Sequence, residues 1–382
     1  MNMKRQTSTI GRGGRNVRYC IQCLTPNTRP RVILDEKGVC NACKNSEAKK
    51  SIDWKSRRDE FENFIEPYRS KSGEWDCVVP WSGGKDSSAI AYRMKFEFGM
   101  NPLLTTFSPM IPNDVGQINR ERIIQLGFDH LFHRPNQAVQ RRLARRFFIE
   151  RGNPKVAWDA GITAFPVQVA ARYKIPIVLY AEHGESEYGG RMIREDANKF
   201  RSYSEVIEHG VGDDPRNWED DGIGAGDLNP YLHPDGEEIG GIVVAYFAYF
   251  FKWSILENYH FIKTKIDFAV HPEGRTSGTF TNFDSLDDKI DALYYYMQFI
   301  KFGFGRCVRD ASRLIQNGQM RREEGLKVSK LYDHEFPEEN IAEVLEYLDL
   351  ERSEFEAIVD KHRNLEIWER NASGWQLRFP LE

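Results

Sequence analysis

Apolar positions in the first half of the chain come in short runs that alternate with longer amphipathic segments. Residues 76–79, 103–107, 129–133 and 176–180 predict strands. Residues 87–98 and 113–126 have the spacing of helices, and each segment is followed by a glycine. Asn113 is the predicted N-cap of the second helix. Strands that alternate with helices predict a doubly wound, Rossmann-like parallel α/β sheet, which binds ligands at the carboxyl ends of its strands.

The flanking segments are less regular. Residues 1–17 are polar and rich in glycine and arginine, which predicts disorder, and residues 51–70 predict a helix. Residues 201–240 are rich in Gly, Asp, Pro and Asn and predict loops with short elements. Ser254 and Glu257 form a capping box that predicts a helix start. From residue 286 to the end we expect mostly helix, with amphipathic stretches at 290–302 and 341–350.

These changes of pattern divide the 382 residues into four predicted parts. An N-terminal tail and four-cysteine module occupy residues 1–50, a linker helix 51–74, the sheet domain 75–200, and a mostly helical region for substrate or partner 201–382. The formal net charge of −4 provides no global field that favours nucleic acid. No apolar leader is visible, and the most apolar window, 242–251, is too short to cross a bilayer. We therefore expect a cytoplasmic protein without membrane insertion.

Four of the six cysteines form two C-x2-C pairs. Cys20 and Cys23 are separated by sixteen residues from Cys40 and Cys43. This spacing is typical of a zinc ribbon or knuckle, in which four thiolates close a tetrahedral structural site. We predict structural zinc at these cysteines, with an iron–sulfur cluster or four unrelated free cysteines as the alternatives.

A loop of small and polar residues follows the first predicted strand and opens the next helix. It lacks the first glycine of a Walker A loop, and the G-x-G-x-x-G fingerprint is absent. Two adjacent glycines let backbone N–H groups converge on an anion, and the helix N-terminus adds positive potential. The loop predicts a cradle for an anion the size of pyrophosphate; the alternative is a glycine turn with a capping serine. Its predicted members are Ser82, Gly83, Gly84, Lys85, Asp86, Ser87 and Ser88.

One member of this loop, Asp86, is unexpected because a carboxylate repels pyrophosphate. A bridging Mg²⁺ would remove the conflict, since carboxylates and phosphates commonly share this ion. Glu182 follows the strand predicted at 176–180 and is expected at the same edge of the sheet. It is the second predicted magnesium ligand, with a cap on a local turn as the alternative.

The S-G-G-K-D-S loop and the alternating elements of residues 75–190 resemble the PP-loop ATP pyrophosphatase superfamily. Members of that superfamily cleave ATP between the α and β phosphates and transfer AMP to an acceptor oxygen. The resemblance implies that residues 75–200 form a PP-loop ATP-binding domain, in which Lys85 stabilises the leaving pyrophosphate. It also implies that the adenine lies near Thr106, Phe107 and Gly161.

Further blocks resemble the N-acetyl sugar amidotransferases over nearly the whole chain. They lie at residues 19–43, 161–166, 185–190, 278–282, 285–289 and 301–306. Members convert an acetamido group on a nucleotide-activated bacterial sugar, or on a nonulosonic acid, into an acetamidino group for lipopolysaccharide or flagellin glycans. The resemblance implies ammonia from a separate glutaminase with a barrel subunit, both similar to the subunits of imidazole glycerol phosphate synthase. A UDP-diacetamido uronic acid and a pseudaminic- or legionaminic-type acid both stay open as the acceptor.

On this hypothesis, polar residues outside the loop are assigned to chemistry and to the acceptor. The predicted catalytic residues are Lys85, Asp86, Glu182 and Glu185. Glu185 and Glu187 are expected to orient the acetamido group or take a proton from ammonia, and Tyr188 to stack on a ring. Five cations are predicted to hold the acceptor's anionic groups, with an exposed or structural role as the alternative for each. They are Arg191, Arg275, Lys289, Lys301 and Arg306.

Two other classes of function fit parts of the pattern. The first is a PP-loop enzyme that modifies tRNA, by thiolation or a related adenylation. The net negative charge disfavours it, and no C-x2-C pair follows the N-terminal ones. The second is a zinc-ribbon binding module on a nucleotide-sensing domain, which the intact loop disfavours.

Overall fold

A five-stranded parallel sheet lies at the centre of the computed structural model, which describes residues 17–382 except 190–198, 203–206, 208–210 and 235. The strand order is β3-β2-β1-β4-β5. The strands are β1 (Cys77–Pro80), β2 (Pro102–Phe107), β3 (Asp129–His133), β4 (Ile177–Tyr180) and β5 (Val243–Tyr246). Because β2 and β4 flank β1 on opposite sides, the crevice at the carboxyl ends of β1 and β4 is the topological switch point. The predicted doubly wound parallel sheet is confirmed.

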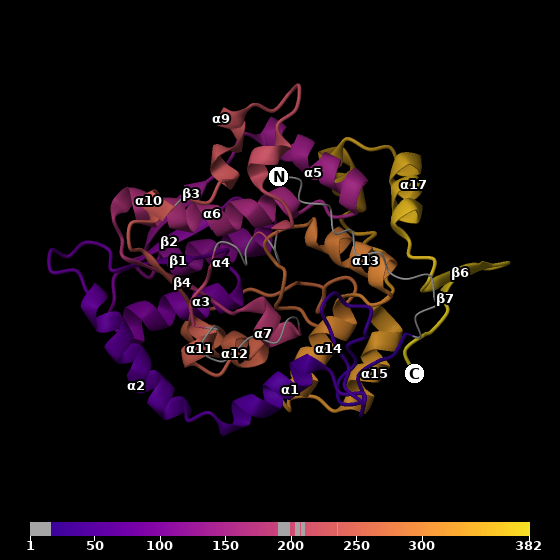
Figure 1. The fold of residues 1–382 in the computed structure, drawn as a ribbon, viewed down its shortest axis with the longest axis horizontal. Coiled ribbons are helices and arrows are strands. Elements are labelled where there is room, and N and C mark those ends of the chain that lie inside the picture. The colour runs from indigo at the N-terminus through magenta and orange to yellow at the C-terminus, as the bar shows by residue number, and fades with distance from the viewer. Residues whose placement is uncertain (1–16, 190–198, 203–206, 208–210, 235) are drawn as a thin grey trace, which may run out of the picture.

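Helices cover both faces of this sheet (Figure 1). Alternate residues of β1 face opposite ways: Val79 packs in one core cluster with Ile90 of α3, and Val78 in another with Val167 of α6. Both faces are therefore buried, which explains why the strands are continuous apolar runs. The helices up to β4 are α1 (Asn41–Ala48), α2 (Trp54–Ile65), α3 (Lys85–Tyr92), α4 (Asp114–Ile124), α5 (Gln137–Arg151) and α6 (Val156–Tyr173).

The chain after β4 is mostly helical. Its shorter helices are α7 (Gly184–Tyr188), α9 (Ala225–Leu228), α10 (Gly236–Ile239) and α11 (Phe247–Phe250). The longer ones are α12 (Ile255–Lys265), α13 (Asp291–Phe302), α14 (Arg306–Gln316), α15 (Arg322–Tyr332), α16 (Ile341–Leu348) and α17 (Arg352–His362). Two predicted caps are confirmed: Asn113 accepts from the Val115 amide at 3.1 Å, and Ser254 accepts from the Glu257 amide at 3.2 Å.

The structure adds two features that the pattern did not predict. The apolar window at 242–251 supplies β5, so the sheet extends past the boundary predicted at residue 200. Near the end of the chain, β6 (Trp368–Asn371) and β7 (Gly374–Leu377) form an antiparallel hairpin where helix was expected. The tail predicted to be disordered lies outside the described residues except for residue 17. Among the described residues, no helix is both long and apolar enough to cross a membrane.

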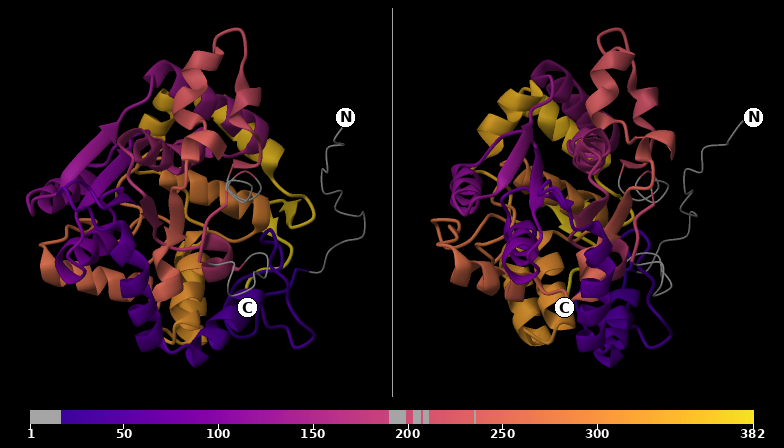
Figure 2. Two further views of the ribbon diagram at one scale, coloured as in Figure 1. Left: turned by 60° about the vertical axis from the view of Figure 1, so that its left-hand side comes forward. Right: turned by 90° about the vertical axis from the view of Figure 1, so that its left-hand side faces the viewer.

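The N-terminal cysteine module packs against helices from the second half of the chain, although it is far from them in sequence. Figures 1 and 2 show its indigo ribbon beside orange helices, and Figure 1 labels α14 and α15 there. The backbone amide of Leu24 donates to Ser312 Oγ at 3.2 Å, and the hydroxyl of Thr28 donates to the Phe302 carbonyl at 2.6 Å. The cysteine module is therefore part of the same packed body as the helical region.

We expect the change Gly161→Ala to destabilise the fold, because a Cβ there would lie 2.3 Å from the Phe107 ring. Overpacking of this kind typically costs about 1–3 kcal/mol of unfolding free energy. Gly226→Ala is the matched control, since Gly226 also lies in a helix but has no atom within 4 Å of the added carbon. Chemical denaturation of the two variants tests this, and equal stability of both would contradict it.

Candidate functional site

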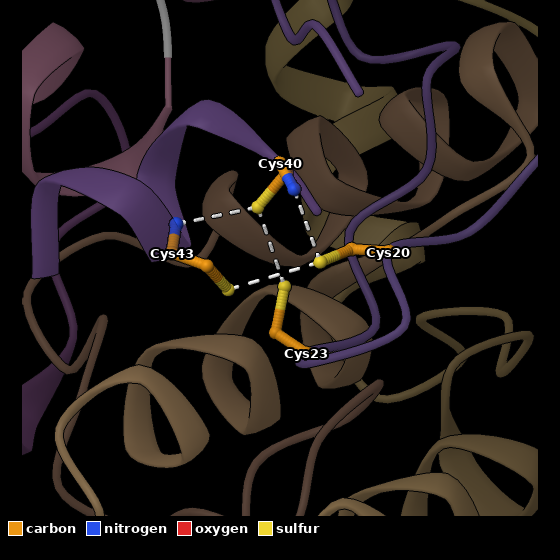
Figure 3. Close-up of side chains that lie close together, drawn as sticks. All are labelled: Cys20, Cys23, Cys40 and Cys43. Atoms are coloured by element: carbon orange, nitrogen blue, oxygen red, sulfur yellow. Dashed lines mark hydrogen bonds between the residues drawn. The ribbon is translucent and has the colours of Figure 1, made fainter. Parts of the chain in front are cut away.

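The four paired cysteines come together in one buried cluster (Figure 3). Their Sγ atoms all lie within 4.8 Å of one another, with Cys20 to Cys43 at 3.8 Å and Cys23 to Cys40 at 3.6 Å. Thiolates about 2.3 Å from a central zinc ion form a tetrahedron with edges of about 3.8 Å, so the residues fit this metal. Backbone amides of Thr25, Cys40 and Cys43 point at three of the sulfurs, at 3.3–3.4 Å, and such donors stabilise thiolate charge.

The cysteine module extends to the short helix α7, which follows β4. Arg29 donates to the Tyr188 carbonyl, Arg31 Nε donates to Glu185 Oε2 at 2.8 Å, and Lys49 pairs with Glu187. On its other side the module holds α14, since Gln316 lies 3.6 Å from the Cys23 sulfur. The cysteine module thus supports two helices, α7 and α14.

The predicted anion loop lies between β1 and α3, at the topological switch point. Gly83 has a φ of +92°, a conformation that L side chains rarely adopt, and an added Cβ would lie 2.6 Å from the Arg120 side chain. Ser82 Oγ accepts from the Gly84 amide at 3.1 Å, and Ser87 Oγ lies 3.4 Å from the Ser82 amide. Small residues are needed here because the loop turns sharply against α4.

Lys85 is almost fully buried, with 1% of its surface exposed. Its ammonium donates to Asp86 Oδ2 and to Asp284 Oδ1, both at 2.7 Å. Burial alone would lower the pKa of Lys85, but the carboxylates of Asp284 and Asp86 hold it above its ordinary value. The second oxygen of Asp86 accepts from Asn258 at 2.8 Å. The ammonium is therefore engaged with two carboxylates in this structure, which leaves backbone amides to face an incoming anion.

Glu182 lies just past β4 and beside Asp86. Burial, together with the negative charge of Asp86, raises the pKa of Glu182 to about 7. Tyr188 donates its hydroxyl to Glu182, and the guanidinium of Arg313 lies 3.4 Å from the centre of the Tyr188 ring. A divalent cation between the Glu182 carboxyl and the Asp86 carboxylate would offset this repulsion. The structure thus brings together both residues predicted to bind magnesium.

The remaining residues predicted to bind ATP are buried around the end of β2. Thr106 donates its hydroxyl to the Trp81 carbonyl, and His130 lies 2.8 Å from the same hydroxyl. Phe107 packs against the helical backbone at Gly161, which has no side chain to keep the ring away. Ser88 is fully buried, and its Oγ accepts from the Trp81 indole at 2.9 Å, so this hydroxyl is engaged inside the protein.

The residues predicted to hold the acceptor separate into two groups. Glu185, Glu187, Tyr188 and Arg306 lie on α7 and α14, and Arg306 donates to the Asp284 carbonyl at 2.6 Å. The other described cations have partners elsewhere: Arg275 pairs with Glu335, Lys289 with Glu343, and Lys301 donates to the Arg151 carbonyl. Arg191 lies outside the described residues.

Several polar residues of this site were not predicted from the sequence. Asp284 and Asn258 have no motif, and their contacts with the loop span 199 and 172 residues. Arg309 lies 3.1 Å from Asp284, while Arg29 and Arg313 contact Tyr188. Arg309 and Arg313 could have been predicted together with Arg306, because residues 306, 309 and 313 repeat at helical spacing and share one face of α14.

Comparison with known proteins gives one family match. Residues 277–379 match the family described as LPS biosynthesis protein WbpG-like, C-terminal domain. The matched region contains Asp284, α14 and the hairpin, and the match supports the family assignment that the sequence motifs indicate. No curated protein sequence matches the chain.

Replacing one metal ligand, as in Cys40→Ala, should remove the bound metal and destabilise the protein by several kcal/mol, because structural zinc contributes folding free energy. Elemental analysis for zinc and iron, together with thermal unfolding, measures both effects. Cys307→Ala is the control, since Cys307 is equally buried but lies outside the cluster. A Cys40→Ala protein that kept its full metal content would contradict the assignment.

Proposed function

We propose that this chain, a member of the N-acetyl sugar amidotransferase family, is an ATP-dependent enzyme of lipopolysaccharide or related surface-glycan biosynthesis that converts an acetamido group into an acetamidino group. The family match to lipopolysaccharide biosynthesis proteins supports the biosynthetic setting. One structural observation supports the chemistry. The loop of residues 82–87 lies at the switch point of the sheet, with Asp86 and Glu182 on either side of the crevice.

The proposed reaction has two steps. An amide carbonyl is a poor electrophile toward ammonia, so its oxygen first attacks the α-phosphate of ATP, which releases pyrophosphate and leaves an O-adenylyl imidate. Ammonia then adds at the carbon, loses a proton, and AMP departs with the former acetamido oxygen. The enzyme's part is to align the two reactants and to stabilise charge that develops on the leaving pyrophosphate.

The loop would hold the leaving phosphates through its backbone. The first amides of α3 have no partner within the helix, and the helix N-terminus attracts anions. Lys85 would contribute indirectly, because it fixes Asp86 and Asp284 at 2.7 Å on either side of its ammonium. Mg²⁺ held by Asp86 and Glu182 would supply positive charge to the phosphate oxygens.

The α7 carboxylates would position the acceptor's side of the crevice. Glu185, a predicted catalytic residue, is bonded to Arg31, and Glu187 is bonded to Lys49. We propose that both fix α7 against the cysteine module, so that Tyr188 faces the crevice. Ammonia would come from a partner glutaminase with a barrel subunit similar to that of imidazole glycerol phosphate synthase.

Asp86→Asn tests the loop's role. The isosteric amide removes the charge that pairs with Lys85 and binds the cation, so AMP formation should fall at least ~100-fold. The assay contains ATP, Mg²⁺, an ammonium salt and each candidate acceptor, and product masses identify exchange of one oxygen for NH. Lys95→Met is the control, since Lys95 is only partly buried and donates to the Gly127 carbonyl, away from the loop.

Two results would count against this proposal. Asp86→Asn with undiminished ammonia-dependent turnover would show that the loop does not serve the reaction. AMP release by the unaltered protein with tRNA, and not with any acetamido sugar, would favour the tRNA-modifying alternative. Circular dichroism and thermal unfolding of each variant separate loss of chemistry from loss of fold.

A further inference from the structure

Helix α14 carries three arginines on one face, but they are not equivalent. Arg306 and Arg309 are bound to Asp284, through its carbonyl at 2.6 Å and its carboxylate at 3.1 Å. Arg313 forms no ion pair within 4.0 Å among the described residues; its guanidinium carbon lies 3.4 Å from the centre of the Tyr188 ring, and its Nε is buried without a hydrogen-bond partner. The charge of Arg313 opposes the rise in the pKa of the buried Glu182 and Glu187 carboxyls, but it forms an ion pair with neither.

A second arginine reaches the same tyrosine from the cysteine module. Arg29 donates to the Tyr188 carbonyl, and no described carboxylate lies within ion-pair distance of it. Burial, with the charges of Arg313 and Arg309 nearby, lowers the pKa of Arg29 to about 10. Both arginines contact Tyr188 and neither has an ion-pair partner among the described residues, so an anion that joined them would supply the ion pairs that both lack.

We propose that Arg29 and Arg313 form an anion subsite that holds the carboxylate or phosphate group of the acceptor. The inference rests on the proposed function, and it assigns the acceptor to the α7 side of the crevice, opposite the loop that takes ATP. A guanidinium presents paired N–H donors that match both carboxylate and phosphate oxygens. Tyr188 contacts both arginines, Arg29 through its carbonyl and Arg313 through its ring.

This subsite depends on the metal centre. Arg29 lies six residues after Cys23, and the segment between them is held by contacts of Leu24 with Ser312 and of Thr28 with Phe302. Loss of the metal should therefore weaken acceptor binding, while the ATP loop, which lies on β1 and α3, keeps its geometry. The four cysteines would act on the acceptor's affinity without touching the acceptor.

Isothermal titration of the metal-loaded, full-length protein tests the subsite without requiring turnover. The probes are UDP for a diphosphate, N-acetylneuraminic acid for a sugar carboxylate, and MgATP. The unaltered protein should bind one of the two anionic probes. Arg29→Gln and Arg313→Gln should each lower the affinity for that probe by about tenfold or more, because a charged hydrogen bond is lost. The affinity for MgATP should stay unchanged. The probe that responds identifies the anion's source.

Controls distinguish charge, shape and folding. Arg313→Lys keeps the positive charge but loses the planar guanidinium, so it should retain part of the affinity for the anionic probe. This partial retention would show that the loss in Arg313→Gln does not come from misfolding. Lys44→Gln removes a cation from the same module, where Lys44 pairs with Asp35 at 2.8 Å, and should change nothing.

Three results would overturn the inference: equal probe affinity in the arginine variants and the unaltered protein, a parallel loss of MgATP affinity, or no binding of UDP or N-acetylneuraminic acid by the unaltered protein. Probe binding that responds to Arg29 and Arg313 in a protein that never forms AMP would instead refute the proposed function and retain the anion subsite.

Discussion

The buried ammonium of Lys85 is the contact on which the candidate site depends. A lone cation in this position would be strongly destabilising, and Lys85 is stabilised by ion pairs with Asp86 and Asp284. Because Asp284 comes from the C-terminal region, this ion pair joins the loop after β1 to a segment 199 residues away. The loop therefore acquires its geometry only when the sheet and the helical region fold as one unit.

The same segment brings α14 into the site. Arg309 of α14 lies 3.1 Å from Asp284. Four residues after Asp284, the carboxylate of Asp288 accepts from the backbone amides of Met110 and Ile111 at 2.6 and 3.0 Å, just past the end of β2. On the far side, the cysteine module packs on α14 and α7. The crevice is consequently bordered by three parts of the chain: the sheet domain, the C-terminal region and the cysteine module. Charged groups of each part are balanced by groups of the other parts.

Local chemistry decided which parts of this arrangement were predictable. The strands of the sheet, the caps Asn113 and Ser254, the four-cysteine cluster and the glycine loop are each specified by residues that are close in sequence. The partners of Lys85, Asp86 and Tyr188 were not, because Asp284, Asn258 and Arg29 respectively reach them only through tertiary packing. Strand β5 was missed since its apolar run continues into α11 without a break, and the hairpin at 368–377 because its strands are short and largely polar.

The central claim is that an amide oxygen of the acceptor attacks ATP at this loop, so the fate of that oxygen is the most direct measurement. An acceptor labelled with ¹⁸O in its acetamido group would be incubated with the protein, ATP, Mg²⁺ and an ammonium salt, and the AMP examined by mass spectrometry. The account predicts that the label appears in the phosphate of AMP in step with acetamidino product. AMP without label, or product formed without AMP, would contradict it.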